Sequence, residues 1–587
     1  MTRSIERWLG VADRLPKFEP IPARSSLERA DIRPDLHAAR RVRESYIPEQ
    51  GISIAQALYN RQASFLSGDQ PQAYYLDPRQ FSTNAKNEIL LISLDPKTVA
   101  PEIVLSPEEW QQVELDEFGL PKLYLLPKEI QHQAFLDSAE YLGKMVCDET
   151  IENVRKVQED IDGNNYPEYS IRSHDFMEDV VGDQGEEVRE RADGALEKSW
   201  TKNNTWNDMR ANRQGFPHEA TSRKAPRKNG IIGKMGRYAR SMVEIVDMAT
   251  GANTVQSIAY GAITGHRTTI TRSGFFIEPK NQVTLAREVF SLIDSLDLSG
   301  LKKENQEFAR QFFKNNIALA VGPNLDDETK NQISEFISLG GRSLTIHTIA
   351  PDKKILETAK ELRKEFGDDM EIAAGVVPDV PYAEELAEHV DIIKFGHGPG
   401  TRCDSANANT LLQNAMEQVI KAKASEKLRG ITVVAHLGSD DNASIPIYLG
   451  AGVGFVRAAT GACAEKSLVY LRDYAGNYVL PNSGDASEPT CFVETAMRPD
   501  LIEKRYNNAG RMEDPEGVIG ATRFSPESSS MGRRLGDIDR IIGNMLMNLG
   551  VTSVGQLYIM LANRSVDILG TESDAARNSS KSKNGVH

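Results

Sequence analysis

The sequence predicts an α/β protein, a (β/α)8 TIM barrel preceded by an α+β extension. Two observations predict the barrel: short apolar strands alternate with amphipathic helices after residue 316, and a glycine-rich loop follows one of these strands. The third observation is that residues 1–215 lack this alternation. We therefore expect an extension of unknown fold over 1–215, the barrel over 216–570 and a disordered polar tail over 571–587.

Six strands, each separated from the next by one helix, are expected in the second half of the chain. The strands are expected at 317–321, 343–349, 371–377, 391–395, 431–435 and 454–458, and the helices at 327–339, 353–366, 382–389, 410–424 and 444–449. Two further strands within 241–277 would complete the eight strands of a barrel. An open, doubly wound parallel sheet is the alternative.

The first 240 residues have weaker patterns. Apolar runs at 89–94 and 123–126 predict strands, and mixed charges with scattered apolar residues at 138–202 predict surface helices. Residues 221–240 are the most basic stretch of the chain. This stretch is either a solvated, mobile loop or a loop that grips phosphate. The solvated loop is favoured because the glycines lack P-loop spacing.

Composition and charge exclude several classes of protein. The 587 residues include 84 acidic and 69 basic ones, a net charge of −15, which argues against a nucleic-acid-binding protein. The four cysteines form no C-x-x-C pair, which argues against a disulfide framework or a zinc knuckle and favours the reducing cytoplasm. No stretch approaches the roughly 18 consecutive apolar residues of a membrane span, so we expect no membrane association.

The loop GHGPGTRCDS at 396–405 directly follows the strand expected at 391–395. In a barrel, catalytic groups lie at the carboxyl ends of the strands. Amides of a glycine-rich loop can approach an anion, and its carbonyls can turn toward a cation. Such amides and an adjacent arginine would lower the pKa of the Cys403 thiol, which makes Cys403 a candidate nucleophile. The alternative is that Cys403 is a small buried hydrophobic residue.

This loop resembles the cysteine loop of the IMP dehydrogenase and GMP reductase family, whose pattern is G-x-G-P-G-S-x-C-x-T. Other segments resemble the family in the same order: VVAHLGSDDNASIPIYLGAGVGFVRAATGACAE at 433–465, the flap residues AM, KRY and PEG at 496–497, 504–506 and 515–517, and a helix at 541–550. The resemblance covers residues 316–565. No counterpart of the family's paired CBS insert is recognised.

The resemblance implies an NAD-dependent oxidation of a purine nucleotide at C2. In the family, the cysteine thiolate, here Cys403, adds to C2, and hydride leaves C2 for the nicotinamide. The resulting thioimidate is hydrolysed by water that Arg505 activates, with Tyr506 beside it, while Ser405 helps to protonate the ring. An arginine acts as a base only in a perturbing environment, and without the resemblance Arg505 would be a surface salt-bridge residue.

The resemblance also implies binding positions. Thr401 keeps the hydroxyl that contacts the substrate phosphate, and Glu516 meets the purine edge. Carbonyls of Gly398, Gly400 and Cys403 would face a potassium ion, since hard cations prefer oxygen ligands. The remaining substrate positions are His436, Gly438, Ala459 and Met497, and the positions toward NAD are His347, Val376, Gly396 and Gly398.

Four of these positions depart from the family pattern. Ala459, together with Ala458, replaces the glycine–serine pair that cradles the phosphate. His436 replaces the aspartate that accepts both ribose hydroxyls, and His347 and Val376 replace an aspartate and an asparagine near the nicotinamide. A neutral imidazole has one acceptor nitrogen, and each ribose hydroxyl left unpaired costs about 1–3 kcal/mol. These changes argue against ordinary IMP as the substrate. His436 contacts a different group, such as a carboxylate, an altered sugar or a phosphate, or it has a structural role.

Two other functions remain open. A GMP reductase-like reaction would use the same cysteine, with ammonia leaving and NADPH supplying hydride, but the Arg505–Tyr506 pair favours the hydrolytic dehydrogenase. A non-catalytic nucleotide-binding or scaffold protein would explain the altered ribose and nicotinamide positions. The resemblance also implies a homo-oligomer, a tetramer.

Overall fold

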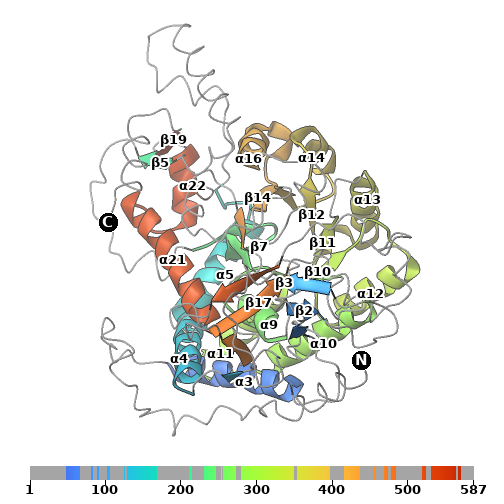
Figure 1. Cartoon of the computed structure of the whole chain (residues 1–587). Helices are drawn as coiled ribbons and strands as arrows, with labels where there is room; N and C mark the ends of the chain where they lie inside the picture. The colour runs from blue at the N-terminus through green and yellow to red at the C-terminus, as the bar shows by residue number, and fades with distance from the viewer. Residues whose placement is uncertain are drawn as a thin grey trace, which may run out of the picture.

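The computed structural model describes a little over half of the chain (Figure 1). The described residues are 48–66, 81–83, 89–91, 102–105, 124–125, 128–167, 210–213, 231–245, 253, 255–272, 279–348, 353–396, 415–436, 449, 454–457, 469–472, 478–483, 519–523, 530–562 and 566–569. The polar tail expected over 571–587 lies outside them.

A sheet of eight parallel strands lies at the centre, in the order β8-β15-β14-β13-β12-β11-β10-β9 (Figure 1). The strands are β8 Val243–Ile245, β9 Thr268–Ile270, β10 Ile317–Val321, β11 Ser343–His347, β12 Glu371–Val377, β13 Ile392–Phe395, β14 Thr432–His436 and β15 Gly454–Arg457. Two backbone hydrogen bonds also link the two ends of this order: Ser241 donates to Gly265 at 2.8 Å and Ile245 to Arg267 at 3.0 Å.

These strands confirm the sequence-based strand predictions. The six later strands begin and end within two residues of the predicted bounds, and β8 and β9 both lie in the window 241–277. All residues of β10 and β12 are buried. Parallel strands that are covered on both faces consist largely of apolar residues, so they could be predicted from runs of apolar residues in the sequence.

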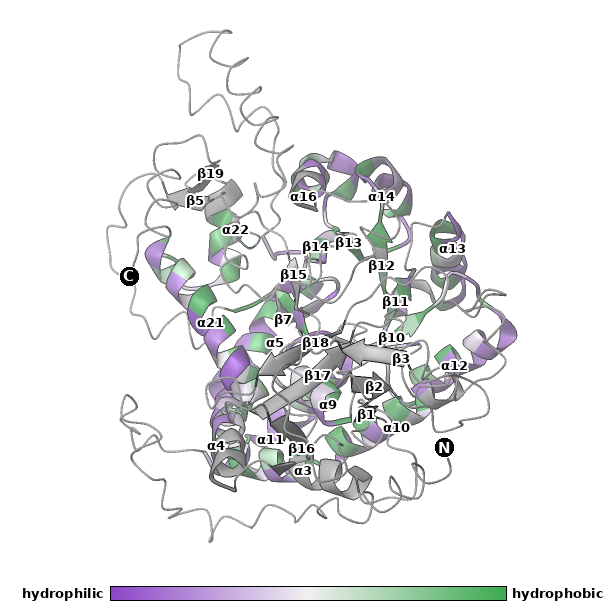
Figure 2. Cartoon of the chain, in the orientation of Figure 1, coloured by the Kyte–Doolittle hydropathy of each residue, from purple (hydrophilic) through white to green (hydrophobic). Residues whose placement is uncertain are grey.

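Amphipathic helices surround the sheet. They are α9 Val255–Ile263, α10 Pro279–Ser295, α11 Lys303–Asn315, α12 Asp327–Ser338, α13 Lys354–Phe366, α14 Val380–Leu386 and α16 Ala415–Ala424. In Figure 2, α12, α13 and α14 carry both hydrophobic and hydrophilic residues, as helices between a core and water do. The predicted helix at 444–449 lies outside the described residues except for Leu449.

Helix α14 begins two residues before its predicted start. The carboxylate of Asp379 accepts a hydrogen bond from the backbone N–H of Tyr382 at 2.9 Å and so caps the helix. A proline occupies the first turn, where its missing N–H costs nothing. The predicted start at 382 was wrong because this Asp-x-Pro capping signal was overlooked.

The helices of the N-terminal part are α3 Glu49–Leu66, α4 Lys128–Met145 and α5 Asp148–Asp162. Helix α4 packs against α3 and against α21 Met531–Asn548 (Figure 1). Phe135, Ala139 and Leu142 of α4 are fully buried. Of the range 138–202 predicted to form surface helices, the structure describes 138–167, where α4 and α5 confirm the helices; residues 168–202 lie outside the described residues. Helix α4 is a packed helix rather than a surface helix.

Four smaller sheets also belong to the described structure. Strands β16 Val469–Arg472, β17 Tyr478–Ser483 and β18 Ile519–Arg523 form an antiparallel sheet with β4 Tyr124–Leu125, in the order β18-β17-β16-β4. The others are β1 Phe81–Thr83 with β2 Ile89–Leu91 and β3 Glu102–Leu105, β5 Arg210–Arg213 with β19 Val566–Leu569, and a hairpin of β6 Ile232–Met235 and β7 Tyr238–Ser241. Both β4 and β5 thus pair with strands from the C-terminal part, which also contains α22 Val554–Ala562.

Substitution of Gly532 tests the packing of α4 against α21. A Cβ at Gly532 would lie 2.6 Å from the Cα of Ser138 and 2.6 Å from the hydroxyl of Tyr260. We expect Gly532→Ala to lower the free energy of unfolding by about 1–3 kcal/mol, because backbone must move to admit the methyl group. Urea unfolding followed by circular dichroism measures this change.

The matched control is Gly536→Ala on the same helix. Its Cβ would lie 3.7 Å from the ring of Tyr141, an ordinary contact. This variant should be unchanged or more stable by up to about 1 kcal/mol, since alanine favours the helix. Equal unfolding midpoints for the two variants would contradict the tight α4–α21 contact.

Candidate active site

Four residues of the predicted site lie at the carboxyl ends of neighbouring strands. His347 ends β11, Val376 is the next-to-last residue of β12, Gly396 follows β13, and His436 ends β14. The carboxyl ends of parallel strands meet at one edge of a sheet, where α/β proteins bind ligands. The structure therefore brings these four residues to one edge, while their individual roles stay predictions.

The register of the strands fixes which residues share a face. His347 pairs with Gly375 across β11 and β12, and Gly375 pairs with Lys394 across β12 and β13. Register partners in parallel strands present their side chains to the same face. A Cβ at Gly375 would lie 2.5 Å from the Cβ of Lys394, so the glycine makes room for the lysine.

Exposure and backbone conformation differ among the edge residues. His347 and His436 are half-buried, and Val376 is buried. Gly396, the first residue of the cysteine loop, has φ of +121°, a conformation that only glycine adopts without strain. The chain can therefore leave β13 sharply at this point.

The other predicted site residues lie outside the described residues. They are Gly398, Gly400, Thr401, Cys403, Ser405, Gly438, Ala459, Met497, Arg505, Tyr506 and Glu516. Residues 484–518, which include Arg505, Tyr506 and Glu516, connect β17 to β18. These two strands pair with each other, and Ser483 is the register partner of Ile519.

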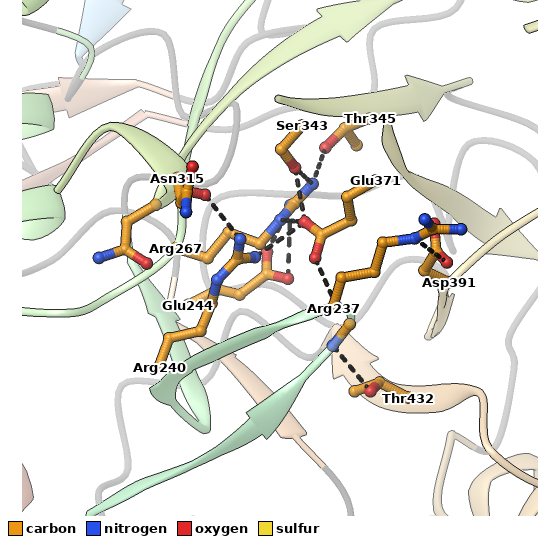
Figure 3. A network of polar contacts seen from close by, with 12 residues as sticks. Arg237, Arg240, Glu244, Arg267, Asn315, Ser343, Thr345, Glu371, Asp391 and Thr432 are labelled. Carbon is orange, nitrogen blue, oxygen red and sulfur yellow. Dashed lines mark hydrogen bonds and ion pairs between the residues drawn. The ribbon is translucent and has the colours of Figure 1, made fainter. Parts of the chain in front are cut away.

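A network of buried charges links strands of the sheet (Figure 3). The side chains of Arg240, Glu244, Arg267, Glu371 and Lys394 are each at most 1% exposed. The ion pairs run in an alternating chain, Arg240–Glu371–Arg267–Glu244–Lys394. Buried charges are tolerated only where they are paired and hydrogen-bonded.

Glu371 accepts hydrogen bonds through both of its carboxylate oxygens. One carboxylate oxygen, Oε1, accepts hydrogen bonds from Arg240 at 2.8 Å, Arg267 at 3.3 Å and the hydroxyl of Ser343 at 2.6 Å (Figure 3). The other, Oε2, accepts the backbone N–H of Arg237 at 3.0 Å. Burial alone would raise the pKa of Glu371, but the two arginines and the Ser343 hydroxyl outweigh it and lower the pKa.

Glu244 extends the network to β13, the strand that directly precedes the cysteine loop. Its carboxylate lies 3.4 Å from the guanidinium of Arg267 and 2.6 Å from the ammonium of Lys394. Arg267 also donates to the hydroxyl of Thr345 at 2.8 Å. Lys394 is two residues before Gly396, so the network reaches the base of the cysteine loop.

A β-hairpin covers the amino end of the sheet. Its strands are β6 Ile232–Met235 and β7 Tyr238–Ser241. At the turn, the backbone N–H of Gly236 donates to the hydroxyl of Thr432, the first residue of β14, at 2.8 Å. The hairpin therefore lies at the end of the sheet opposite the predicted site.

The hairpin overturns the solvated-loop prediction for residues 231–240; residues 221–230 lie outside the described part. Arg240 is bound by Glu371, and Arg237 by Asp391 at 2.6 Å, so acids of the sheet strands take up these basic charges. A signal was present in the sequence, because Glu244, Glu371 and Lys394 are charged residues inside apolar strands. Such residues seldom become fully buried unless they are paired.

The parallel sheet, with candidate residues gathered at its carboxyl edge, defines an α/β protein, a class whose ligands bind at that edge. A family model described as the IMP dehydrogenase / GMP reductase domain matches residues 142–558, most of the chain. The chain therefore belongs to this family of oxidoreductases. No curated protein matches the chain.

Neither a metal-binding cluster nor a membrane-spanning helix is found within the part of the chain that the structure describes. Within the described ranges, no group of three or more His, Cys, Asp or Glu side chains is placed to hold a metal ion. None of the helices that the structure describes has the length and apolar character to cross a membrane.

Removal of the Glu371 charge tests the buried network. In Glu371→Gln, the guanidinium groups of Arg240 and Arg267 stay buried with less compensating charge. We expect the free energy of unfolding to fall by about 3–5 kcal/mol, as for other broken buried pairs. Urea unfolding at pH 7 measures this loss.

Glu335→Gln is the matched control, because Glu335 pairs with Arg287 and both side chains are about half exposed. Exposed pairs contribute about 0.2–1 kcal/mol, so this variant should remain close to the wild type. Similar losses in the two variants would show that the buried network does not hold the sheet together.

Proposed function

We propose that the chain is an NAD-dependent oxidoreductase that oxidises a purine nucleotide, or a purine-like relative, at C2 through a covalent intermediate on Cys403. The supporting observation is the start of the cysteine loop at Gly396, at the carboxyl edge of a parallel sheet in a member of the IMP dehydrogenase / GMP reductase family. His347, Val376 and His436 share that edge.

We also infer that the eight strands close into a (β/α)8 barrel. The strands neighbour one another in sequence order, whereas a doubly wound sheet reverses its order at a switch point. The hydrogen bonds from Ser241 and Ile245 to the residues before β9 support contact between the two end strands. In a closed barrel, the edge residues would surround a single mouth.

The proposed reaction has two steps. The Cys403 thiolate forms a bond to C2, and hydrogen leaves C2 as a hydride, taking the bonding electron pair with it. Bound NAD would accept this hydride. Water then adds to C2 as Arg505 takes its proton, and the carbon–sulfur bond breaks to return the thiolate. Tyr506 would lie beside Arg505, and the hydroxyl of Ser405 would protonate the ring.

The remaining parts of the proposal concern ligands and assembly. Thr401 would hold the phosphate and Glu516 the purine edge, while the carbonyls of Gly398, Gly400 and Cys403 would bind potassium. Hard cations suit such an all-oxygen site. A homotetramer in the cytoplasm completes the proposal, with the lack of C-x-x-C pairs supporting a reducing compartment.

An activity assay with a cysteine control tests the reaction. We expect NADH formation at 340 nm when the protein receives NAD and a purine nucleotide, tested with IMP and its base- and ribose-modified analogues, with and without potassium. Cys403→Ala should abolish turnover because it removes the nucleophile. Cys147→Ala should retain it, because Cys147 lies at the start of α5, far along the chain from the loop.

Three outcomes would contradict the proposal. Turnover that survives in Cys403→Ala would exclude the covalent mechanism. NADPH consumption with GMP and ammonia release, without NADH formation from any analogue, would favour the reductase. Lack of turnover with all substrates, together with unchanged nucleotide binding in Cys403→Ala, would indicate a non-catalytic protein.

Restoration of a carboxylate at His436 tests the basis of substrate choice. His436→Asp would supply two acceptor oxygens at the end of β14. If this position faces the ribose, the KM for IMP should fall about tenfold, equal to about 1.4 kcal/mol, within the range for restored hydrogen bonds. Steady-state kinetics with IMP measures this.

His347→Asp is the control for this variant. It introduces the same charge at the end of β11, on the side that the resemblance assigns to the nicotinamide. Its KM for IMP should stay within about twofold of the wild type, well below one factor of ten in binding. Equal effects of the two substitutions would show that general charge, rather than ribose contact, governs binding.

A further inference from the structure

The N-terminal and C-terminal parts of the chain meet at several places. Strand β4 pairs with β16 through Leu125 and Val469, and β5 pairs with β19. Helix α4 packs against α21, which makes a helix–helix interface between the two parts.

One polar contact lies inside the helix–helix interface. The hydroxyl of Tyr141 on α4 donates a hydrogen bond to Oδ2 of Asp539 on α21 at 2.8 Å. The two residues are only 4% and 7% exposed. The second carboxylate oxygen of Asp539, Oδ1, is buried and has no hydrogen-bond partner. A buried carboxylate with one oxygen unpaired is costly, and a neutral carboxyl is less so.

The surrounding groups do little to offset the charge of Asp539. On α4, Lys144 acts on it from a distance, but that side chain is 64% exposed and pairs with Glu140 at 2.6 Å. On α9, the hydroxyl of Tyr260 donates to the carbonyl of Ser138. Burial raises the pKa of Asp539 to about 7, against the opposing effects of the Tyr141 hydrogen bond and Lys144.

The charged neighbours on α21 itself are engaged elsewhere. Asp537 and Arg540 form an exposed ion pair at 3.3 Å, with side chains 40% and 52% exposed. Among the described residues, no cation forms an ion pair with Asp539. Its ionisation therefore places in the interface a charge that no ion pair within the described residues neutralises.

We propose that Asp539 is a proton-dependent clasp that holds α21 against α4. In its neutral form the carboxyl is compatible with the buried contact, and in its ionised form it weakens the contact. Because the folded-state pKa lies above the ordinary value of 3.8, this stabilisation is complete below about pH 3.8 and is lost progressively as the pH rises from there to about 7. This clasp does not depend on the proposed reaction, and Tyr141 precedes the family match at 142–558.

Hydrogen–deuterium exchange of the full chain at pH 6 and pH 8 tests the clasp. After correction for intrinsic exchange, the opening constant of α21 amides should rise about tenfold between these pH values, which follows from linkage with pKa values of 3.8 and about 7. Asp539→Asn keeps the shape and removes the ionisation, so its corrected exchange should be the same at both pH values. Asp537→Asn, on the same helix, should keep the tenfold rise.

Tyr141→Phe provides a second readout should Asp539→Asn fail to fold. Loss of the hydroxyl donor disfavours the ionised carboxylate further, so the pH midpoint of the exchange transition should move upward. Equal protection of α21 at both pH values in the wild type would overturn the proposal. A tenfold rise that persists in Asp539→Asn, or an unmoved midpoint in Tyr141→Phe, would also overturn it.

Discussion

The hydrogen bonds and ion pairs that converge on Glu371 constrain the rest of the structure. Four separate parts of the chain donate to this carboxylate: the hairpin turn, β7, the residue before β9, and the start of β11. None of these donors could bury its polar group without the carboxylate, and the carboxylate could not stay buried without them. The network thereby fixes the positions of β9, β11 and β12 relative to the hairpin.

The amino and carboxyl ends of the sheet differ in the residues they carry and in what covers them. The amino end is closed by the hairpin and joined by charges, whereas the carboxyl end carries His347, Val376 and His436, three of the positions that depart from the family pattern. Side chains at the carboxyl end can therefore change without disturbing the bonds of Glu371. The fold can therefore persist while residues at the carboxyl end of the sheet vary.

Sequence patterns predicted the strands well because β10 and β12 are buried on both faces and hence apolar. They placed His347 and His436 at strand ends for the same reason. The hairpin could not be found in this way, since Arg240 and Glu371 are 131 residues apart and a basic stretch resembles a solvated one. Nor does the sequence reveal what His436 contacts, because the loss of an aspartate shows which bond is missing and not which one replaced it.

The register pair Ser483 and Ile519 has a consequence for how this protein can diversify. Because these residues are register partners in adjacent strands, the two ends of the segment that joins them are held close together. A change in its length costs mainly loop-closure entropy, about 0.6 kcal/mol for each doubling. Insertions, deletions or grafted sequences between β17 and β18 can thus be accommodated while the sheet keeps its geometry.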